Sequence, residues 1–236
     1  MALKMTVAFS GNQRVQPLID GSLKPEDIDL EVVTVEGGML FFRNLQYDEF
    51  DASEMSISET LLAKERGDGF CWDWSALPVF SPGTGLAPGQ TVSMDRYGGT
   101  PLTGNPRIRP LLDDGGRAVV AEFYRKTGAF MANHHVIVQN RILKDNPWAA
   151  MALFKAFQES KELAYQDARR QRSTYLYFQG YDEHDHAAIF GEDPYPLGLK
   201  AMRPTVDRAM QGSLEQGLIR KPMRPEDIYH PATLDT

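Results

Sequence analysis

Apolar and polar residues alternate in short segments near the start of the chain, and each segment is followed by residues with helical spacing. Residues 3–9 (LKMTVAF) and the β-branched run 28–35 (IDLEVVTV) have the alternation of strands. Residues 13–20 (QRVQPLID) and 37–47 (GGMLFFRNLQY) have the apolar spacing of helices. The pattern predicts an α/β protein that begins strand, helix, strand, helix.

Residues 50–67 (FDASEMSISETLLAKERG) continue this alternation with a third strand and a third helix. The strand is expected over FDAS, and Ser56 with Glu59 three residues later has the spacing of a capping box at the helix start. Ser53 and Glu54 then fall in the connecting loop without a structural role. Because ligands of open α/β sheets bind at the carboxyl ends of strands, these two residues become candidates for a binding site.

The second half of the pattern starts with a fourth strand, residues 76–80 (ALPVF). Residues 81–106 are rich in glycine and proline and carry almost no periodic apolar pattern, which predicts a long loop or linker. Residues 118–128 (AVVAEFYRKTG) fit a helix or a strand, and residues 134–140 (HHVIVQN) fit a strand. A long amphipathic helix is expected over residues 147–170, followed by a mostly helical C-terminal part.

Composition restricts the class of protein further. The 236 residues are 42% hydrophobic and 24% charged, with a net charge of −7, so a broad basic face for nucleic acid or anionic membrane is not expected. The start of the chain lacks the apolar core of a signal peptide, and no segment has the roughly 20 apolar residues that span a bilayer. The single cysteine, Cys71, excludes an intrachain disulfide. A cytoplasmic protein is expected.

Several stretches together resemble the 4,5-dihydroxyphthalate decarboxylase family. The most specific are residues 51–58 (DASEMSIS) and 224–234 (RPEDIYHPATL), and residues 122–128 (EFYRKTG), 146–165 (NPWAAMALFKAFQESKELAY) and 195–199 (YPLGL) add to them. The resemblance covers residues 1 to 80 and about 105 to 236. It implies a type 2 periplasmic binding protein-like fold in which a ligand lies in the cleft between two lobes.

The sequence departs from the family in two places that concern this cleft. After Phe80 the chain passes to the glycine- and proline-rich segment, where the family continues into a second lobe. The expected domains are therefore residues 1–80 as the first part of one αβα lobe, 81–106 as a linker replacing the second lobe, and 107–236 as the return segment with C-terminal helices. Of the family's Tyr-Asp-Arg-Thr motif after the first strand, only Arg14 remains.

The resemblance implies decarboxylation of an aromatic dicarboxylate such as 4,5-dihydroxyphthalate, which needs no cofactor. A proton donor, a cation for the second carboxylate and partners for the phenols are required. His134 is the expected general acid and Arg14 the carboxylate clamp, with Ser53 and Glu54 beside the phenols. Arg43 is a further candidate cation. His135, the next residue of the strand, should point to the opposite face.

Each candidate has an ordinary structural alternative. Arg14 and Arg43 also fit solvated helix arginines, His134 fits a histidine hydrogen-bonded at a strand end, and Glu54 fits a solvated turn acid. Residues 182–186 (DEHDH) suggest a metal site, but the spacing of their histidines favours an exposed polar loop, and no metal is expected.

The function also has alternatives. One is a non-catalytic solute-binding or sensor protein for a small aromatic or carboxylated ligand. Another is an inactive remnant whose cleft is covered by a partner subunit. Loss of one lobe would expose an apolar cleft wall, which favours a homo-oligomer.

Overall fold

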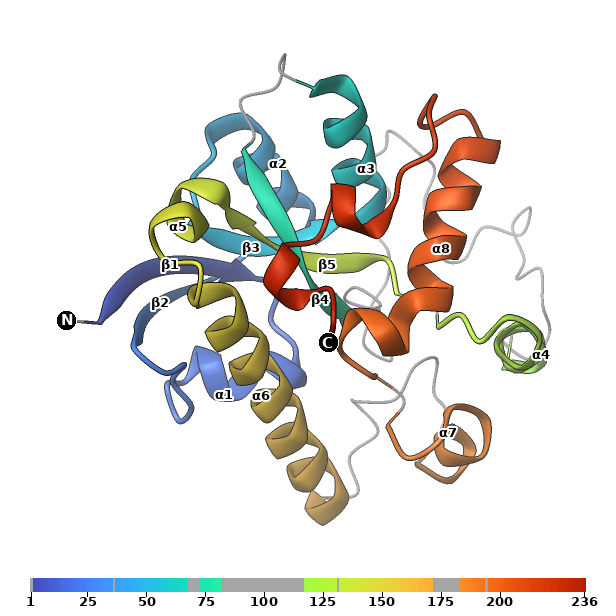
Figure 1. Cartoon of the computed structure of the whole chain (residues 1–236). Coiled ribbons are helices and arrows are strands. Elements are labelled where there is room, and N and C mark those ends of the chain that lie inside the picture. Colours follow the sequence, from blue (N-terminus) through green and yellow to red (C-terminus); the bar gives the residue numbers. More distant parts are fainter. Residues whose placement is uncertain are drawn as a thin grey trace, which may run out of the picture.

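A five-stranded mixed sheet runs through the middle of the molecule, with helices on both faces (Figure 1). The computed structural model describes residues 2–35, 37–67, 73–81, 117–130, 132–171, 183–193 and 195–236. The strand order is β2-β1-β3-β5-β4. The strands are β1 (Leu3–Phe9), β2 (Ile28–Thr34), β3 (Ala52–Ser56), β4 (Trp74–Ser81) and β5 (His134–Gln139).

The pairing of the strands brings several chain segments to one edge of the sheet. Strand β1 is parallel to β2 and to β3, whereas β5 runs antiparallel to its neighbours β3 and β4. Ser56 and Ser81, the last residues of β3 and β4, both pair with His134, the first residue of β5. The carboxyl ends of β1, β3 and β4 and the start of β5 therefore share one edge.

The helices cover both faces of the sheet and enclose two main apolar cores. Helices α1 and α6 lie on one face and α2, α3 and α8 on the other (Figure 1). The helices are α1 (Gln16–Ile19), α2 (Gly37–Tyr47), α3 (Ile57–Arg66), α4 (Arg117–Thr127), α5 (Asn140–Asp145), α6 (Ala149–Gln171), α7 (Glu183–Phe190) and α8 (Leu199–Glu215), with 3-10 turns at η1 (Gln13–Val15), η5 (Pro225–Asp227) and η6 (Pro231–Thr233).

Most of the elements expected from local patterns are present. The structure confirms strands within residues 3–9, 28–35, 76–80 and 134–140, and it makes residues 117–127 a helix. The long amphipathic helix is α6, whose Leu153, Phe154 and Phe157 are buried against the sheet. The predicted linker, residues 81–106, lies outside the described residues from position 82 onward.

Three local expectations are wrong. Ser53 and Glu54 lie inside β3 instead of in a loop, because they pair with β5, opposite Ile137 and Val136. The capping box is absent: the Ser56 side chain makes no capping hydrogen bond, and its Oγ lies 2.9 Å from the Oγ of Ser58. Residues 183–186, expected in a polar loop, belong to helix α7.

His135 is part of the core on the face of the sheet covered by α3, opposite the side chain of His134. Its ring is 1% exposed, and Nε2 forms a 2.7 Å hydrogen bond with the Thr60 hydroxyl. Burial, with a smaller contribution from His134, lowers the pKa of His135 from 6.5 to about 3. The imidazole is therefore neutral in the folded protein at every ordinary pH.

We expect the free energy of unfolding to fall as the pH is lowered from 6.5 towards 3. In that window the unfolded chain binds a proton at His135 that the folded chain does not, so acid favours unfolding by up to about 1.4 kcal/mol per pH unit for this one group. His135→Gln should flatten this slope in urea titrations at several pH values. An equal slope in both proteins would contradict the assignment.

Candidate functional site

Glu54 and His134 form a buried acid–base pair at the carboxyl edge of the sheet. The Nδ1 atom of His134 lies 2.7 Å from Oε1 of Glu54, and the two side chains are 13% and 5% exposed. Glu54 pairs directly with Val136, so His134, two residues earlier on β5, is its diagonal neighbour on the same face. The strand register therefore produces the contact.

Ser10, directly after β1, holds the other oxygen of the Glu54 carboxylate. Its backbone N–H donates to Oε2 at 3.1 Å, and its hydroxyl donates to the same oxygen. Burial acts to raise the pKa of Glu54. The hydrogen bond and the charge of His134 outweigh this effect, together with the two hydrogen bonds from Ser10, and they hold the pKa of Glu54 below its ordinary value. Glu54 is therefore an ionised carboxylate that accepts a hydrogen bond from Nδ1 of His134.

One aromatic ring and one further acid complete the surroundings of His134. Within the described part of the chain, Nδ1 is the one side-chain atom of His134 that forms a hydrogen bond. The ring of Phe41 packs edge-on against the imidazole, with centroids 4.9 Å apart. Glu59, expected as a capping residue, has a buried Oε2 that has no hydrogen-bond partner among the described residues. Burial raises the pKa of Glu59, and the charge of His134 opposes this shift only in part.

Glu54 lines a hollow of about 440 Å³, a volume that includes open solvent at its mouth, whereas His134 is not among the lining residues. Arg14 and Glu54 both line it, so two of the groups predicted from the sequence do share one hollow. The lining residues come from four strands, from η1 and its flanks, from α6 and from the segment before α8: Phe9, Asn12, Arg14, Val15, Glu54, Val79, Phe80, His135, Val136, Phe157, Lys161 and Leu197.

Local contacts fix Arg14 in the turn after β1. The side chain of Asn12 accepts the Arg14 N–H at 3.1 Å, and the Arg14 carbonyl accepts the Ser160 hydroxyl at 2.7 Å. The guanidinium carbon lies 4.4 Å from the centroid of the Tyr195 ring, within cation–π distance. The arginine is thus held in place at the hollow by α6 and by the segment before α8.

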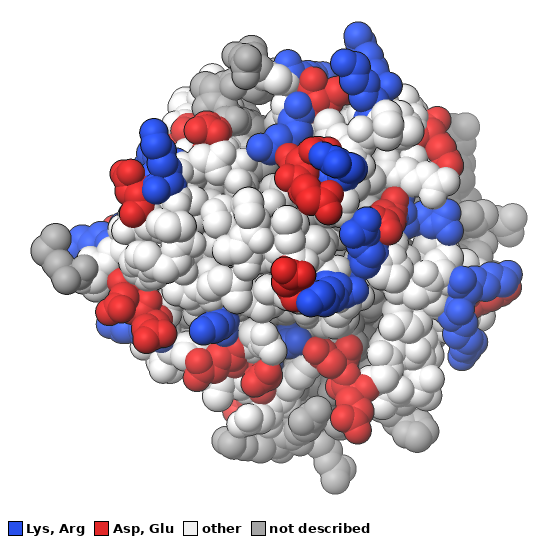
Figure 2. Space-filling model, in the orientation of Figure 1, with Lys and Arg blue, Asp and Glu red and all other residues white. Residues whose placement is uncertain are grey.

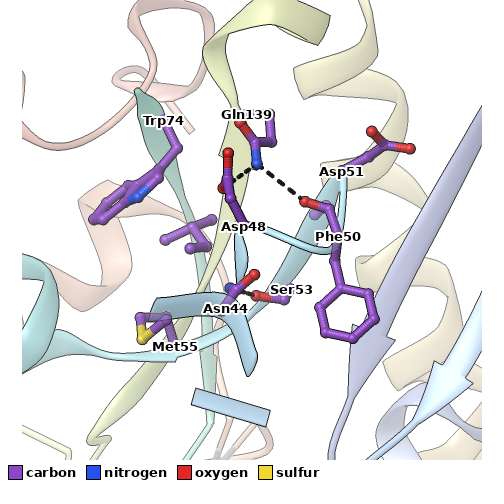
Figure 3. A pocket seen from close by; sticks show the side chains of 10 residues that line it. Asn44, Asp48, Phe50, Asp51, Ser53, Met55, Trp74 and Gln139 are labelled. Atoms are coloured by element: carbon purple, nitrogen blue, oxygen red, sulfur yellow. Dashed lines mark hydrogen bonds between the residues drawn. The ribbon is translucent and has the colours of Figure 1, made fainter. Parts of the chain in front are cut away.

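Ser53 does not share this hollow. Successive strand side chains alternate between faces, so Ser53 points away from Glu54. Its hydroxyl is fully buried, accepts a hydrogen bond from the Asn44 side chain and donates to the Glu54 carbonyl at 3.2 Å. Ser53 lines a separate hollow of about 240 Å³, together with Trp74 and Gln139 (Figure 3). The expectation that Ser53 and Glu54 face one ligand is therefore wrong.

Arg43 also lies apart from the Glu54 hollow. It forms an ion pair with Glu49 through two hydrogen bonds, one of them 2.7 Å from Nε, and its guanidinium carbon is 4.9 Å from the centroid of Phe50. The side chain is 30% exposed. These contacts match the alternative of a solvated helix arginine, and Arg43 is not among the residues that line the hollow.

Sequence reasoning missed Ser10 and Lys161. Ser10 belongs to the Ser-Gly-Asn that ends the first strand, and the strand-end argument applied to Glu54 would have selected it too. Lys161 lies in the middle of α6, where a lysine gives no local sign that it faces the sheet. Its side chain is 5% exposed and lines the hollow with Arg14.

Two further findings concern the part of the chain that the structure describes. No group of three or more His, Cys, Asp or Glu residues there could hold a metal ion, and no helix there is both long and apolar enough to cross a membrane. Acidic and basic side chains are interspersed on the face seen in Figure 2. That face therefore has no broad area of one charge.

Comparison with known protein families finds no family model that matches. Among curated proteins, the chain is similar to 4,5-dihydroxyphthalate decarboxylase of Comamonas testosteroni, with 28% identity over 137 residues. The match covers 56% of this chain and 41% of that protein. The chain thus spans less than half the length of this relative.

Solved structures extend the comparison to the fold. A putative periplasmic sulfonate-binding protein from Methylobacillus flagellatus is similar with a TM-score of 0.53 and 12% identity, over 99% of this chain and 93% of that chain. The periplasmic aliphatic sulphonate binding protein of Escherichia coli has a TM-score of 0.50 and 11% identity, over 99% of both chains. The sheet order, the helical layers and these similarities together show that the chain has the periplasmic binding protein fold.

Proposed function

We propose that this protein is a carboxy-lyase that decarboxylates an aromatic dicarboxylate such as 4,5-dihydroxyphthalate. The observation that carries the proposal is the 2.7 Å contact between His134 and Glu54, because Glu54 lines one hollow together with Arg14. The partial sequence similarity to 4,5-dihydroxyphthalate decarboxylase supports the substrate class.

In the proposed reaction the protonated His134 delivers a proton from Nε2 to the ring carbon that bears the leaving carboxylate. The bond between that carbon and the carboxylate then breaks, its electron pair restores the aromatic ring, and CO2 departs. His134 becomes neutral and regains a proton from solvent. Glu54 stabilises the imidazolium form through Nδ1, and Ser10 holds Glu54 in position.

Arg14 supplies the charge that positions the substrate. A planar guanidinium matches a carboxylate with two parallel hydrogen bonds, and the stacking on Tyr195 presents it in a fixed orientation. The aromatic ring of the substrate would lie against the apolar lining contributed by Phe9, Val136 and Phe157. The proposed acid and the cation thus act on different parts of one small ligand.

Incubation of the purified protein with 4,5-dihydroxyphthalate tests the proposal. We expect one equivalent each of 3,4-dihydroxybenzoate and CO2, measured by chromatography and by a coupled CO2 assay, because the proton replaces one carboxylate. Phthalate, which lacks the hydroxyl groups that make the ring carbon basic, should bind without releasing CO2. An absence of product at millimolar substrate would refute the lyase function.

The second candidate is a protein that binds a small carboxylated ligand without chemistry. The observation that favours it is the presence of two cations, Arg14 and Lys161, at the hollow, since these alone suffice to hold an anion. In this case calorimetry would detect binding of 4,5-dihydroxyphthalate and the ligand would be recovered unchanged. If the protein neither binds nor converts 4,5-dihydroxyphthalate, the result would favour the inactive remnant.

A further inference from the structure

We infer that Lys161 and Arg14 together form an anion subsite that binds the carboxylate retained in the product. This deepens the proposed function, on which it rests for the identity of the ligand as an aromatic ortho-dicarboxylate. The subsite itself is argued from contacts in the structure. Its test is a binding measurement that does not depend on turnover.

Lys161 is a buried cation that uses two of its three N–H donors in hydrogen bonds to described residues. Its Nζ atom lies 2.6 Å from Oδ2 of Asp193 and 3.1 Å from the carbonyl oxygen of Tyr195. A lysine ammonium has three N–H donors, and among the described residues Lys161 makes these two hydrogen bonds. Nζ also lies 5.7 Å from the centroid of the Tyr165 ring, within cation–π distance. This contact uses no hydrogen-bond acceptor, and the side chain lines the hollow, so the third donor is available to an anionic ligand there.

The cost of burying this charge argues for a use in binding. An ammonium in a nearly enclosed position is unfavourable unless it is well paired. Asp193 pairs with it but is itself 45% exposed, so solvent weakens the compensation. A ligand carboxylate in the hollow would supply the additional negative charge in a drier environment.

Tyr195 connects the two cations. Its ring lies under the Arg14 guanidinium, and its carbonyl oxygen accepts from Lys161. Its own N–H donates at 3.0 Å to the hydroxyl of Tyr165, which in turn donates at 2.8 Å to Oδ1 of Asp193. Both cations are therefore fixed to one residue before any ligand binds, which lowers the entropy cost of binding.

The arrangement gives the hollow two different chemical parts. Arg14 and Lys161 share Tyr195, whereas Glu54 is joined to His134 and Ser10. If one carboxylate of the ligand binds the two cations, the ring carbon that bears the other carboxylate would be directed toward the acid–base pair. The subsite would thus hold one of the two equivalent carboxylates while the other leaves as CO2.

Calorimetric titration with phthalate tests the subsite. Lys161→Met should weaken binding by about 10- to 100-fold, because one charge-assisted hydrogen bond is lost. Asp193→Asn should tighten binding by about 3- to 10-fold, because it removes the carboxylate that competes with the ligand for the Lys161 ammonium. The amide oxygen of the new asparagine can still accept the hydrogen bond from Tyr165. Lys155→Met, an exposed lysine of the same helix, should change the affinity by less than about twofold.

Several results would overturn the inference. They are an absence of phthalate binding to the wild-type protein, an unchanged affinity in a folded Lys161→Met variant, or an Asp193→Asn variant with equal or weaker binding. If Lys161→Met fails to fold, the direction of the Asp193→Asn effect decides, because a purely structural ion pair predicts no gain. Opposite shifts in the two variants without any CO2 release would support the subsite and refute the lyase.

Discussion

His134→Asn is expected to lower the turnover of 4,5-dihydroxyphthalate by about 10²- to 10⁴-fold, the usual contribution of a general acid. Asparagine can keep a hydrogen bond to the Glu54 carboxylate but has no proton to give near neutral pH. The affinity for phthalate should stay within about threefold, because the carboxylate is held by other residues. Steady-state kinetics and calorimetry on the same preparation measure both quantities.

The matched control for this variant is His230→Asn. His230 is the cap of the 3-10 turn η6, where its Nδ1 accepts the Ala232 N–H at 3.2 Å, and asparagine is a good substitute at such a position. Turnover should be unchanged in the control. If His134→Asn decarboxylates at the wild-type rate, His134 is not the proton donor and the proposed mechanism is wrong.

Glu54→Gln is expected to lower turnover by about 10²- to 10³-fold, although the shape of the side chain is preserved. Ser10 donates to Oε2 through both its N–H and its hydroxyl, so the glutamine oxygen should take that position and the amide nitrogen should face His134. The amide would then donate to Nδ1 and favour the neutral imidazole. A neutral imidazole is too weak an acid to protonate the ring.

The stability of Glu54→Gln provides a second measurement. The pKa of Glu54 lies below its ordinary value of 4.5 in the folded protein, so the ionised group stabilises the fold above pH 4.5, and this contribution is lost as the pH falls through the folded pKa. The variant should lack this part of the acid sensitivity in denaturant titrations. Wild-type turnover together with a wild-type pH profile would show that Glu54 has no electrostatic role.

Ser10→Ala is the graded comparison for Glu54→Gln. It removes the hydroxyl donor but keeps the Ser10 N–H and the carboxylate charge, so turnover should fall by no more than about tenfold. A loss as large as that of Glu54→Gln would mean that the orientation of Glu54 matters more than its charge.

The sequence predicted elements well where the signal is local. Alternation over residues 3–9 and 28–35 identified β1 and β2, and the helical spacing of residues 147–170 identified α6. The strand-end argument selected Ser53 and Glu54, of which only Glu54 lines the hollow with Arg14, and the family resemblance added Arg14 and His134. These predictions depend on side-chain periodicity and on the positions where strands end. Both signals are present in short stretches of sequence.

The outcome for Ser53 and Glu54 shows where local signals stop. The two residues look like a polar loop, yet they form strand because β5, more than 80 positions later, supplies the hydrogen-bond partners. The same pairing sends Ser53 to one face and Glu54 to the other. A one-residue slip in that register would exchange the faces on which Ser53 and Glu54 lie, and no local pattern in the sequence specifies the register.

By itself, the sequence determined the order of strands and helices, the absence of a disulfide within the chain, and the segments that end at the carboxyl edge of the sheet. The tertiary structure alone decided that Ser10 holds Glu54, that Lys161 joins Arg14 at the hollow and that Arg43 does not. The reason is physical: periodicity sets which way a side chain points along its own element, whereas contacts between elements depend on strand register and helix placement, which only the packed chain fixes.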